Sequence, residues 1–237
     1  MICIIPARAG SKRIPGKNMK DFLGKPIISY PIQTAIESKL FDKIIVAIDD
    51  EFIGRWLFEK HKTVTPYMRE PENATDDAEL EAVLYEVLEN FKQVDYCCML
   101  LPCAVFTTVD LLEHGRSLMT PVIKLKDMKE IQAAFPVVHF SYPPQRALEI
   151  SNESAHFVAA SHSNSQDYRK QYHDAGQFYW LNVDEFRMSW RWAQVRILNM
   201  ENRVMILQEF EAQDIDTIDD WALAEMKYRR LYGHDNA

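Results

Sequence analysis

The chain has 237 residues, of which 47% are hydrophobic and 26% are charged, and its formal net charge is -8. This length and composition suit one α/β domain with a modest insertion and a substantial apolar core. The acidic balance argues against a nucleic-acid-binding surface, and no apolar stretch approaches the roughly 20 residues of a membrane span.

The first predicted strand is the apolar run at residues 1–5. It is too short for a signal peptide and no basic segment precedes it, so we expect a cytoplasmic protein. Cys3 lies in this run, and the four cysteines show no metal-type spacing with histidine. We therefore expect small buried thiols in a reducing compartment.

A basic segment that contains glycine follows this strand directly, and residues 6–18 read PARAGSKRIPGKN. Glycine lets backbone N–H groups approach an anion, and basic side chains neutralise it, as a triphosphate requires. The spacing is not that of the Walker pattern, because Asn18 follows Lys17. The alternative is a solvated basic turn, which is less expected in an acidic protein.

Apolar periodicity predicts the elements that follow. Residues 27–40 and 80–91 have the spacing of helices, a short helix is expected around residues 52–57, and residues 43–48 and 96–101 read as buried strands. This alternation predicts an α/β fold with a mostly parallel sheet, helices on both faces and right-handed crossovers. In such sheets, ligands collect at the carboxyl ends of the strands.

The alternation breaks at residues 136–175, where Pro143-Pro144 and a polar stretch at 161–171 interrupt it. We interpret this part as an insertion of extended segments and loops within a single domain that spans residues 1–237. A strand is expected again at residues 176–181, and a final amphipathic helix at 218–232.

Two carboxylates, Asp214 and Asp216, stand shortly before that helix and are separated by one residue. In an extended segment they point the same way. Hard oxygen ligands suit Mg²⁺, which bridges phosphate oxygens. The alternative is an ordinary polar helix N-terminus in which Asp216 or Thr217 is the cap.

The segment IIPARAGSKRIPGKN resembles the signature of the acylneuraminate cytidylyltransferases, the CMP-sugar synthetases, and Gly24-Lys25-Pro26 extends the match. The resemblance implies a Rossmann-like fold of the nucleotide-diphospho-sugar transferase type. It implies transfer of CMP from CTP to a nonulosonic acid with release of pyrophosphate, which activates the sugar for surface glycan or flagellin glycosylation.

The resemblance also implies roles for individual residues. Arg8 and Lys17 would hold the CTP phosphates, and Mg²⁺ would sit on Asp214 and Asp216, so that Arg8, Lys17 and Asp216 carry catalysis. The implied nucleotide-binding residues are Ala9, Gly10, Ser11, Asn18, Arg69 and Asp76. For Arg69 and Asp76, a surface-loop charge and a helix cap are the alternatives.

Three segments of the insertion and its end, at residues 142–148, 165–167 and 172–180, resemble the pseudaminic acid branch of this family more than the sialic acid or KDO branches. An acid sugar needs a cation for its carboxylate and hydrogen-bond partners for its amides and hydroxyls. The implied sugar-binding residues are Gln145, Arg146, Gln166, Asp167, His173 and Asp174. For His173 and Asp174, a structural hydrogen-bonded pair is the alternative.

The chain departs from the family pattern at three places: Glu79-Leu80, residues 102–106, and Asn164. These departures leave sialic or legionaminic acid as alternative substrates, and a catalytically impaired nucleotide-binding homologue as an alternative function. No general base is identified, and no Ser-His-Asp or Cys-His arrangement supports a covalent intermediate. Because the family is usually dimeric through the insertion, we expect a homodimer, with no nucleic-acid or membrane partner.

Overall fold

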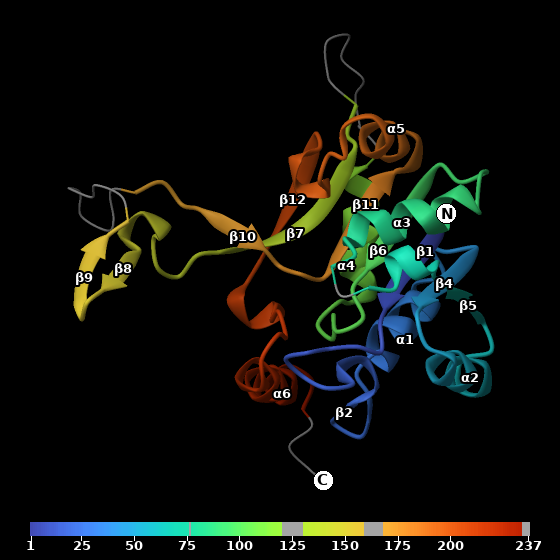
Figure 1. Ribbon diagram of the computed structural model, residues 1–237, viewed down its shortest axis with the longest axis horizontal. Coiled ribbons are helices and arrows are strands. Elements are labelled where there is room, and N and C mark those ends of the chain that lie inside the picture. The colour runs from blue at the N-terminus through green and yellow to red at the C-terminus, as the bar shows by residue number, and fades with distance from the viewer. Residues whose placement is uncertain (76, 120–129, 159–167, 234–237) are drawn as a thin grey trace.

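The computed structural model describes residues 1–75, 77–119, 130–158 and 168–233 (Figure 1). Its strands are β1 (Ile2–Ala7), β2 (Asp21–Phe22), β3 (Lys25–Pro26), β4 (Lys43–Ile48), β5 (Val64–Met68), β6 (Tyr96–Leu100), β7 (Ala133–His139), β8 (Leu148–Ser151), β9 (Ser154–Phe157), β10 (Tyr172–Asp174), β11 (Phe178–Asn182) and β12 (Asn202–Leu207). Its α-helices are α1 (Ser29–Ser38), α2 (Glu51–Lys60), α3 (Leu80–Glu89), α4 (Val109–Leu118), α5 (Val183–Ala193) and α6 (Ile218–Tyr232). Short 3-10 turns are η1 (Lys17–Met19), η2 (Pro71–Asn73), η3 (Pro144–Arg146), η5 (Ile197–Asn199) and η6 (Glu209–Glu211).

An eight-stranded sheet forms the centre of the molecule, in the order β10-β7-β11-β6-β1-β4-β5, with β12 paired to β7. Strands β6, β1, β4 and β5 pair in parallel, and β12 is parallel to β7. Strand β11 runs antiparallel to both β6 and β7, and β10 runs antiparallel to β7. The predicted mostly parallel sheet is confirmed, with β10 and β11 as its antiparallel members.

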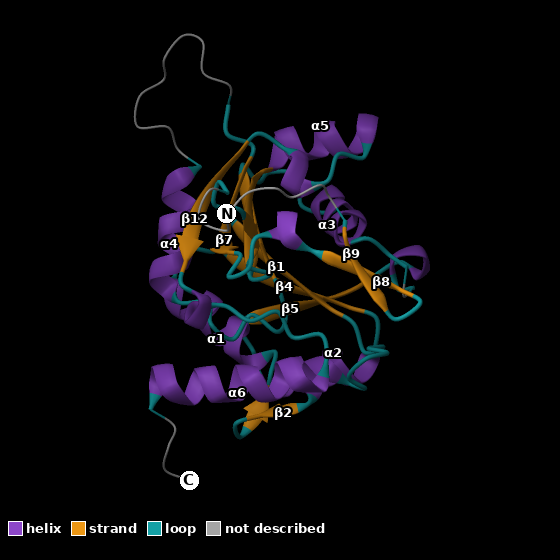
Figure 2. Cartoon of the chain, turned by 90° about the vertical axis from the view of Figure 1, so that its left-hand side faces the viewer, coloured by secondary structure: helices purple, strands orange, loops and turns teal. Residues whose placement is uncertain are grey.

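Side chains of the central strands alternate between two apolar layers, as the period of a strand requires. Cys3 and Ile5 of β1 pack in a cluster with α1, α2 and α4, whereas Ile2 and Ile4 pack in a cluster with α3 and α5. Figure 2 shows α4 and α3 on opposite sides of the strands. Both faces are therefore covered, which explains why the parallel strands read as continuous apolar runs.

Polar caps set where several helices begin. The Asp50 side chain accepts hydrogen bonds from the backbone N–H groups of Phe52 and Ile53 at the start of α2. Thr217 and Asp220 form a reciprocal capping box at the start of α6. Thr217 is thus the cap of α6, which leaves Asp216 outside the helix. Helix α6 buries Trp221 and Ala224 against the segments around β2 and β3.

A projection extends from one end of the sheet. Residues 140–158 and 168–171, which we call the arm, connect β7 to β10 and contain the β8–β9 hairpin (Figure 1). The hairpin turns at Asn152 and Glu153, both with positive φ, as a tight two-residue turn needs. The predicted insertion 136–175 therefore contains the arm together with the end of β7 and all of β10, which belong to the central sheet.

Within the described ranges, no helix has both the length and the apolar character needed to cross a membrane.

Candidate functional site

A cavity of about 590 Å³ opens at the carboxyl ends of the parallel strands. Its wall draws on the loops after β1, β5 and β6, on the start of α3, on the β10–β11 turn and on the segment before α6. The lining residues are Pro6, Arg8, Ser11, Lys12, Arg13, Lys17, Asn18, Arg69, Thr75, Ala78, Leu80, Val83, Leu101, Pro102, Asp174, Gly176, Tyr179, Asp214 and Asp216. We call it the first cavity.

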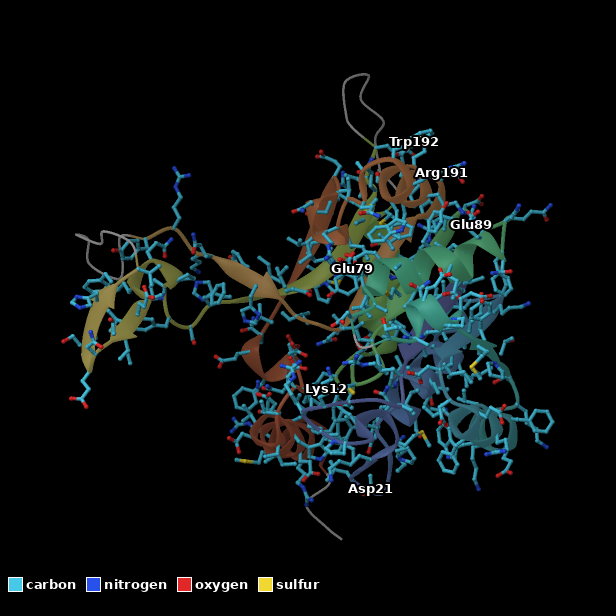
Figure 3. The ribbon with its side chains drawn as sticks, viewed as in Figure 1. Lys12, Asp21, Glu79, Glu89, Arg191 and Trp192 are labelled. Carbon is cyan, nitrogen blue, oxygen red and sulfur yellow. The ribbon has the colours of Figure 1, made fainter. Side chains whose placement is uncertain are left out.

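Basic side chains of the loop after β1 meet the carboxylates before α6 across the first cavity. Arg13 forms an ion pair with Asp216 at 2.7 Å. Lys17 donates to the Ile215 carbonyl at 2.5 Å and lies 3.5 Å from Asp216. Lys12, labelled in Figure 3, belongs to the same loop and also lines the first cavity. Segments about 200 residues apart in sequence thus form one charged site.

The loop after β1 is stabilised by hydrogen bonds within the loop and by hydrogen bonds to neighbouring segments. The buried Asn18 donates its amide to the Arg8 carbonyl at 2.8 Å, and the Cys103 thiol lies 3.6 Å from the Asn18 amide oxygen. Burial raises the pKa of Cys103 to about 12, so the thiol stays protonated and donates. The Ala9 N–H donates to Asp49 at 2.7 Å. The Asn18 side chain therefore stabilises the loop. The Ala9 N–H is already hydrogen-bonded to Asp49.

Arg69 is a buried arginine that lines the first cavity just after β5. Its Nε and one terminal nitrogen both donate to the Ala47 carbonyl, at 3.1 and 2.9 Å. Burial lowers the pKa of Arg69, and nearby Asp49 and Glu86 oppose that shift. A guanidinium stays charged in proteins, so Arg69 brings a fixed cation with free donors to the cavity wall.

Three carboxylates converge on the opposite side of the first cavity. Crowding by protein and the neighbouring Asp216 raise the pKa of Asp214. Tyr179 donates its hydroxyl to one Asp174 oxygen, while the other Asp174 oxygen is buried and has no hydrogen-bond partner among the described residues. Gly176 adopts φ +62, and a Cβ there would stand 3.5 Å from the Asp214 carboxyl carbon. The glycine thus turns the chain closely past this carboxylate.

The same three carboxylates also border a second cavity of about 310 Å³, on the side of α6. His173, Gln213, Asp220 and Lys227 line this second cavity and not the first. The carboxylates therefore form a partition between two spaces.

The donor set suits a hard cation that completes its coordination elsewhere. Among the described residues, no preassembled group of three or more His, Cys, Asp or Glu side chains could hold a metal. Mg²⁺ is normally held by one or two carboxylates, with waters and phosphate oxygens as its other ligands. Asp214 and Asp216 on the first cavity, with the unpartnered Asp174 oxygen beside them, fit that mode.

The structure brings most of the predicted phosphate and nucleotide ligands together. Arg8, Ser11, Lys17, Asn18 and Arg69 all line the first cavity. Ala9 and Gly10 are not among its lining residues. Asp76 lies outside the described residues.

The predicted sugar ligands are divided between places. Asp174 lines both cavities, and His173 lines only the second, where its Nδ1 lies 2.8 Å from the Asp174 carbonyl. Gln145 and Arg146 lie in η3 on the arm, away from both cavities (Figure 1). Within a single chain they therefore share no cavity with Asp174, because the arm projects outward, and their role as sugar ligands stays a prediction. Gln166 and Asp167 lie outside the described residues.

Sequence reasoning missed several residues of the site. Arg13 was one of four basic residues in the loop, and only the fold shows that it pairs with Asp216. Tyr179 lies in the stretch predicted as a strand, and it is buried, but its hydroxyl reaches Asp174. Two of the three departures from the family pattern meet at the first cavity, where Leu80 and Pro102 form part of the wall, and the third, Asn164, lies outside the described residues. Glu79, labelled in Figure 3, instead pairs with Arg196.

Comparisons with known proteins agree with this geometry. Residues 2–101 match the family model described as Cytidylyltransferase. The chain is 35% identical over 244 residues to the pseudaminic acid cytidylyltransferase of Campylobacter jejuni subsp. jejuni serotype O:2, with 100% of this chain and 98% of the relative covered.

A shorter match links the chain to the CMP-N,N'-diacetyllegionaminic acid synthase of Legionella pneumophila, at 32% identity over 48% of this chain and 51% of the relative. A solved structure of CMP:2-keto-3-deoxy-manno-octonic acid synthetase complexed with CTP superposes with a TM-score of 0.69 at 18% identity, with 98% of each chain covered. At that identity, the structural likeness shows a shared fold.

Proposed function

The chain belongs to the cytidylyltransferase family, and from that premise we propose that it transfers CMP from CTP to a nonulosonic acid, preferentially pseudaminic acid, and releases pyrophosphate. It is therefore an enzyme of the nucleotidyltransferase class. The observation that carries the proposal is the first cavity, in which the basic loop after β1 faces Asp214 and Asp216. The cytoplasm, which supplies CTP, is the proposed location.

In the proposed reaction, the anomeric hydroxyl oxygen of the sugar attacks the α-phosphorus of CTP. A new oxygen–phosphorus bond forms, and the hydroxyl gives up its proton to water. The bond between the α-phosphorus and the bridging oxygen breaks, and pyrophosphate leaves with the electron pair. Arg8 and Lys17 face the charge that develops on the leaving group. Fixed cations aimed at developing charge, together with positioning, account for most catalysis of this kind.

Asp214 and Asp216 would hold Mg²⁺, which when bound neutralises phosphate charge and orients the reacting oxygens. In the ligand-free protein, Arg13 and Lys17 occupy Asp216. A triphosphate offers these cations stronger acceptors, because charge-assisted bonds to phosphate compete with the carboxylate. Nucleotide binding would therefore draw Arg13 and Lys17 away from Asp216, where both contact the same oxygen, Oδ1.

The choice of pseudaminic acid rests on two observations. At 35% identity, the chain resembles a pseudaminic acid cytidylyltransferase over its full length, whereas the legionaminic acid synthase matches over about half of this chain. Asp174, in the segment that resembles the pseudaminate branch, presents a buried oxygen that lacks a partner. A substrate hydroxyl or amide would satisfy that oxygen, and a buried polar group left unpaired discriminates strongly against an analogue that lacks the donor.

We propose a homodimer that forms through the arm. The cross-strand pairs Leu148–Phe157 and Ile150–Ala155 place these four apolar side chains on one face of the β8–β9 hairpin. All residues of β8 and β9 are exposed, and Ile150 is 77% exposed. An isolated two-stranded hairpin is marginally stable in water. We propose that this face packs on a second copy of the chain and carries Gln145 and Arg146 toward the second copy's cavities.

Pyrophosphate release from CTP, measured with a panel of nonulosonic acids and with KDO, tests the proposed function. We expect CTP-dependent release with pseudaminic acid at a higher kcat/KM than with N-acetylneuraminic or legionaminic acid. A preference for another nonulosonic acid would overturn the assignment of the sugar. No release with any acceptor would favour the impaired nucleotide-binding homologue.

A further inference from the structure

The segment that carries Asp214 and Asp216 has little backbone structure of its own. Residues 212–216, between η6 and the cap of α6, belong to no helix or strand. Side chains from elsewhere therefore hold it. Asp220 accepts from the N–H groups of Asp216 and Thr217 at the end nearest α6, at 3.1 and 2.7 Å.

A buried lysine of α6 holds the other end of this segment. Lys227 is 8% exposed, and its ammonium donates to the Glu209 carbonyl at 2.8 Å, the Ala212 carbonyl at 2.9 Å and the Gln213 side-chain oxygen at 3.0 Å. An ammonium has three donors, and all three are used. Gln213 in turn donates its amide to the Asp214 carbonyl at 2.9 Å. A continuous chain of hydrogen bonds thus runs from Lys227 to Asp214.

Gln177 reinforces the same stretch from the sheet. Its amide donates to the Glu211 carbonyl at 2.7 Å, and its oxygen accepts from the Thr107 hydroxyl at 3.0 Å. The carbonyls of Glu209, Glu211 and Ala212 are therefore each satisfied by a side chain from another element.

We propose that Lys227 is a positioning residue that fixes the 212–216 segment, so that Asp214 and Asp216 face the first cavity in the geometry that the transfer requires. Removing a cation from water is costly, and an apolar side chain of similar volume often stabilises such a site better. Lys227 forms no ion pair with a carboxylate in the described part of the chain. The three oxygens that its ammonium contacts all belong to residues just before the two carboxylates, so the contacts of this buried cation position that segment.

The inference rests on the proposed function, and the experiment distinguishes a failure of the inference from a failure of the proposed function. Lys227→Met removes the ammonium and keeps the length of the side chain, and Arg229→Met on the exposed face of α6 is the matched control. We expect kcat to fall about 10–100-fold in Lys227→Met, the range for groups that orient metal ligands. The KM for CTP should change less, because Arg8 and Arg69 are untouched. Arg229→Met should keep wild-type kinetics.

Amide hydrogen exchange gives a readout that needs no turnover. In Lys227→Met we expect faster exchange confined to residues 209–216, with the strands of the sheet unchanged. Lys227→Ala should regain part of its activity with propylamine, which replaces the lost ammonium from the adjoining second cavity. A purely structural lysine would show neither local exchange nor rescue by an amine.

Wild-type kcat in Lys227→Met, or exchange that rises uniformly over the chain, would overturn the proposal. If the lysine variants do not fold, Gln213→Met at a half-buried side chain removes the hydrogen bonds that connect Lys227 to Asp214. An unchanged kcat in Gln213→Met would also overturn the proposal. A wild-type enzyme that is inactive with every acceptor would refute the proposed function instead, while the exchange measurement would still decide the role of Lys227.

Discussion

The nucleotide end of the molecule and the arm are built in opposite ways. Around the first cavity, chain segments from both halves of the sequence meet, buried residues such as Asn18 and Arg69 are tied to backbone carbonyls, and the loop is fixed at several points. On the arm, both strands of the hairpin are exposed and one whole face is apolar. The difference motivates our proposal that one chain would complete its phosphate and metal chemistry alone, whereas the arm would pack on a second chain.

The largest effect is expected at the carboxylates of the nucleotide end. Asp216→Asn keeps the shape of the side chain but offers an amide oxygen, which is a poorer ligand for a hard cation. We expect kcat/KM to fall about a thousandfold, at the upper end of the range for loss of one preorganised group. Near-wild-type turnover at limiting Mg²⁺ would contradict the role of Asp216 as a ligand.

The basic loop gives the next largest effect. Lys17→Ala should lower kcat/KM for CTP by about a hundredfold, because a fixed charge that faces the leaving group is lost. Lys12→Ala should have a smaller effect, since Lys17 is anchored at Ile215 and Asp216 and Lys12 is exposed. Steady-state kinetics of the two variants side by side checks this, and equal losses would indicate a diffuse basic patch rather than a specific clamp.

A charged substitution on the arm should affect dimer formation and sugar-dependent turnover without affecting CTP binding at the nucleotide end. Ile150→Glu places a carboxylate at the centre of the apolar face, and Glu149→Lys, on the opposite face of the same strand, is the matched control. We expect Ile150→Glu to be monomeric in sedimentation and to lose sugar-dependent turnover at least about tenfold, since a buried unpaired charge is costly. CTP binding, measured by calorimetry, should be unchanged. A dimeric Ile150→Glu variant would contradict the proposed use of this face.

The smallest effect concerns stability and pH. The folded state holds a proton on Asp214 to higher pH than the unfolded chain, because the pKa of Asp214 is raised by its crowded surroundings and by Asp216. The stability contribution is therefore present below the ordinary aspartate pKa and is lost as the pH rises through the raised value. Asp214→Asn should raise the Tm of the ligand-free enzyme at pH 7 by on the order of 1–3 °C, since the open cavity screens the charge. Calorimetry at pH 7 and at about pH 3.5 checks this, because the gain should vanish where the wild-type carboxyl is protonated.

Sequence reasoning went furthest where a local pattern fixes the structure. The strands at 43–48 and 96–101 and the helix at 218–232 are present as predicted, because both faces of the sheet are buried and α6 begins at a Thr217–Asp220 capping box. The pairing of β11 between β6 and β7 had no local signature, since strand order is decided by packing over the whole chain. Helix α5 and strand β12 were likewise not predicted, and both follow the part where the alternation breaks.

The site divides in the same way. Arg8, Lys17, Asp214 and Asp216 stand in continuous motifs, so their grouping at one cavity could be anticipated. Other contacts of the site have no local pattern in the sequence. Only the folded chain shows the Arg13–Asp216 ion pair, the Tyr179–Asp174 hydrogen bond and the three contacts of Lys227. The distance of Gln145 and Arg146 from both cavities follows from the direction of the arm, which composition does not encode.

Subunit mixing tests most directly whether the arm of one chain completes the site of another. Lys17→Ala disables the nucleotide end and leaves the arm intact, whereas Arg146→Ala disables the arm and leaves the nucleotide end intact. If the two variants exchange subunits at random, half of the dimers are mixed and each mixed dimer has one intact site, so the mixture should recover about a quarter of wild-type activity. A mixture no more active than the sum of its two components would contradict the division of labour between the nucleotide end and the arm.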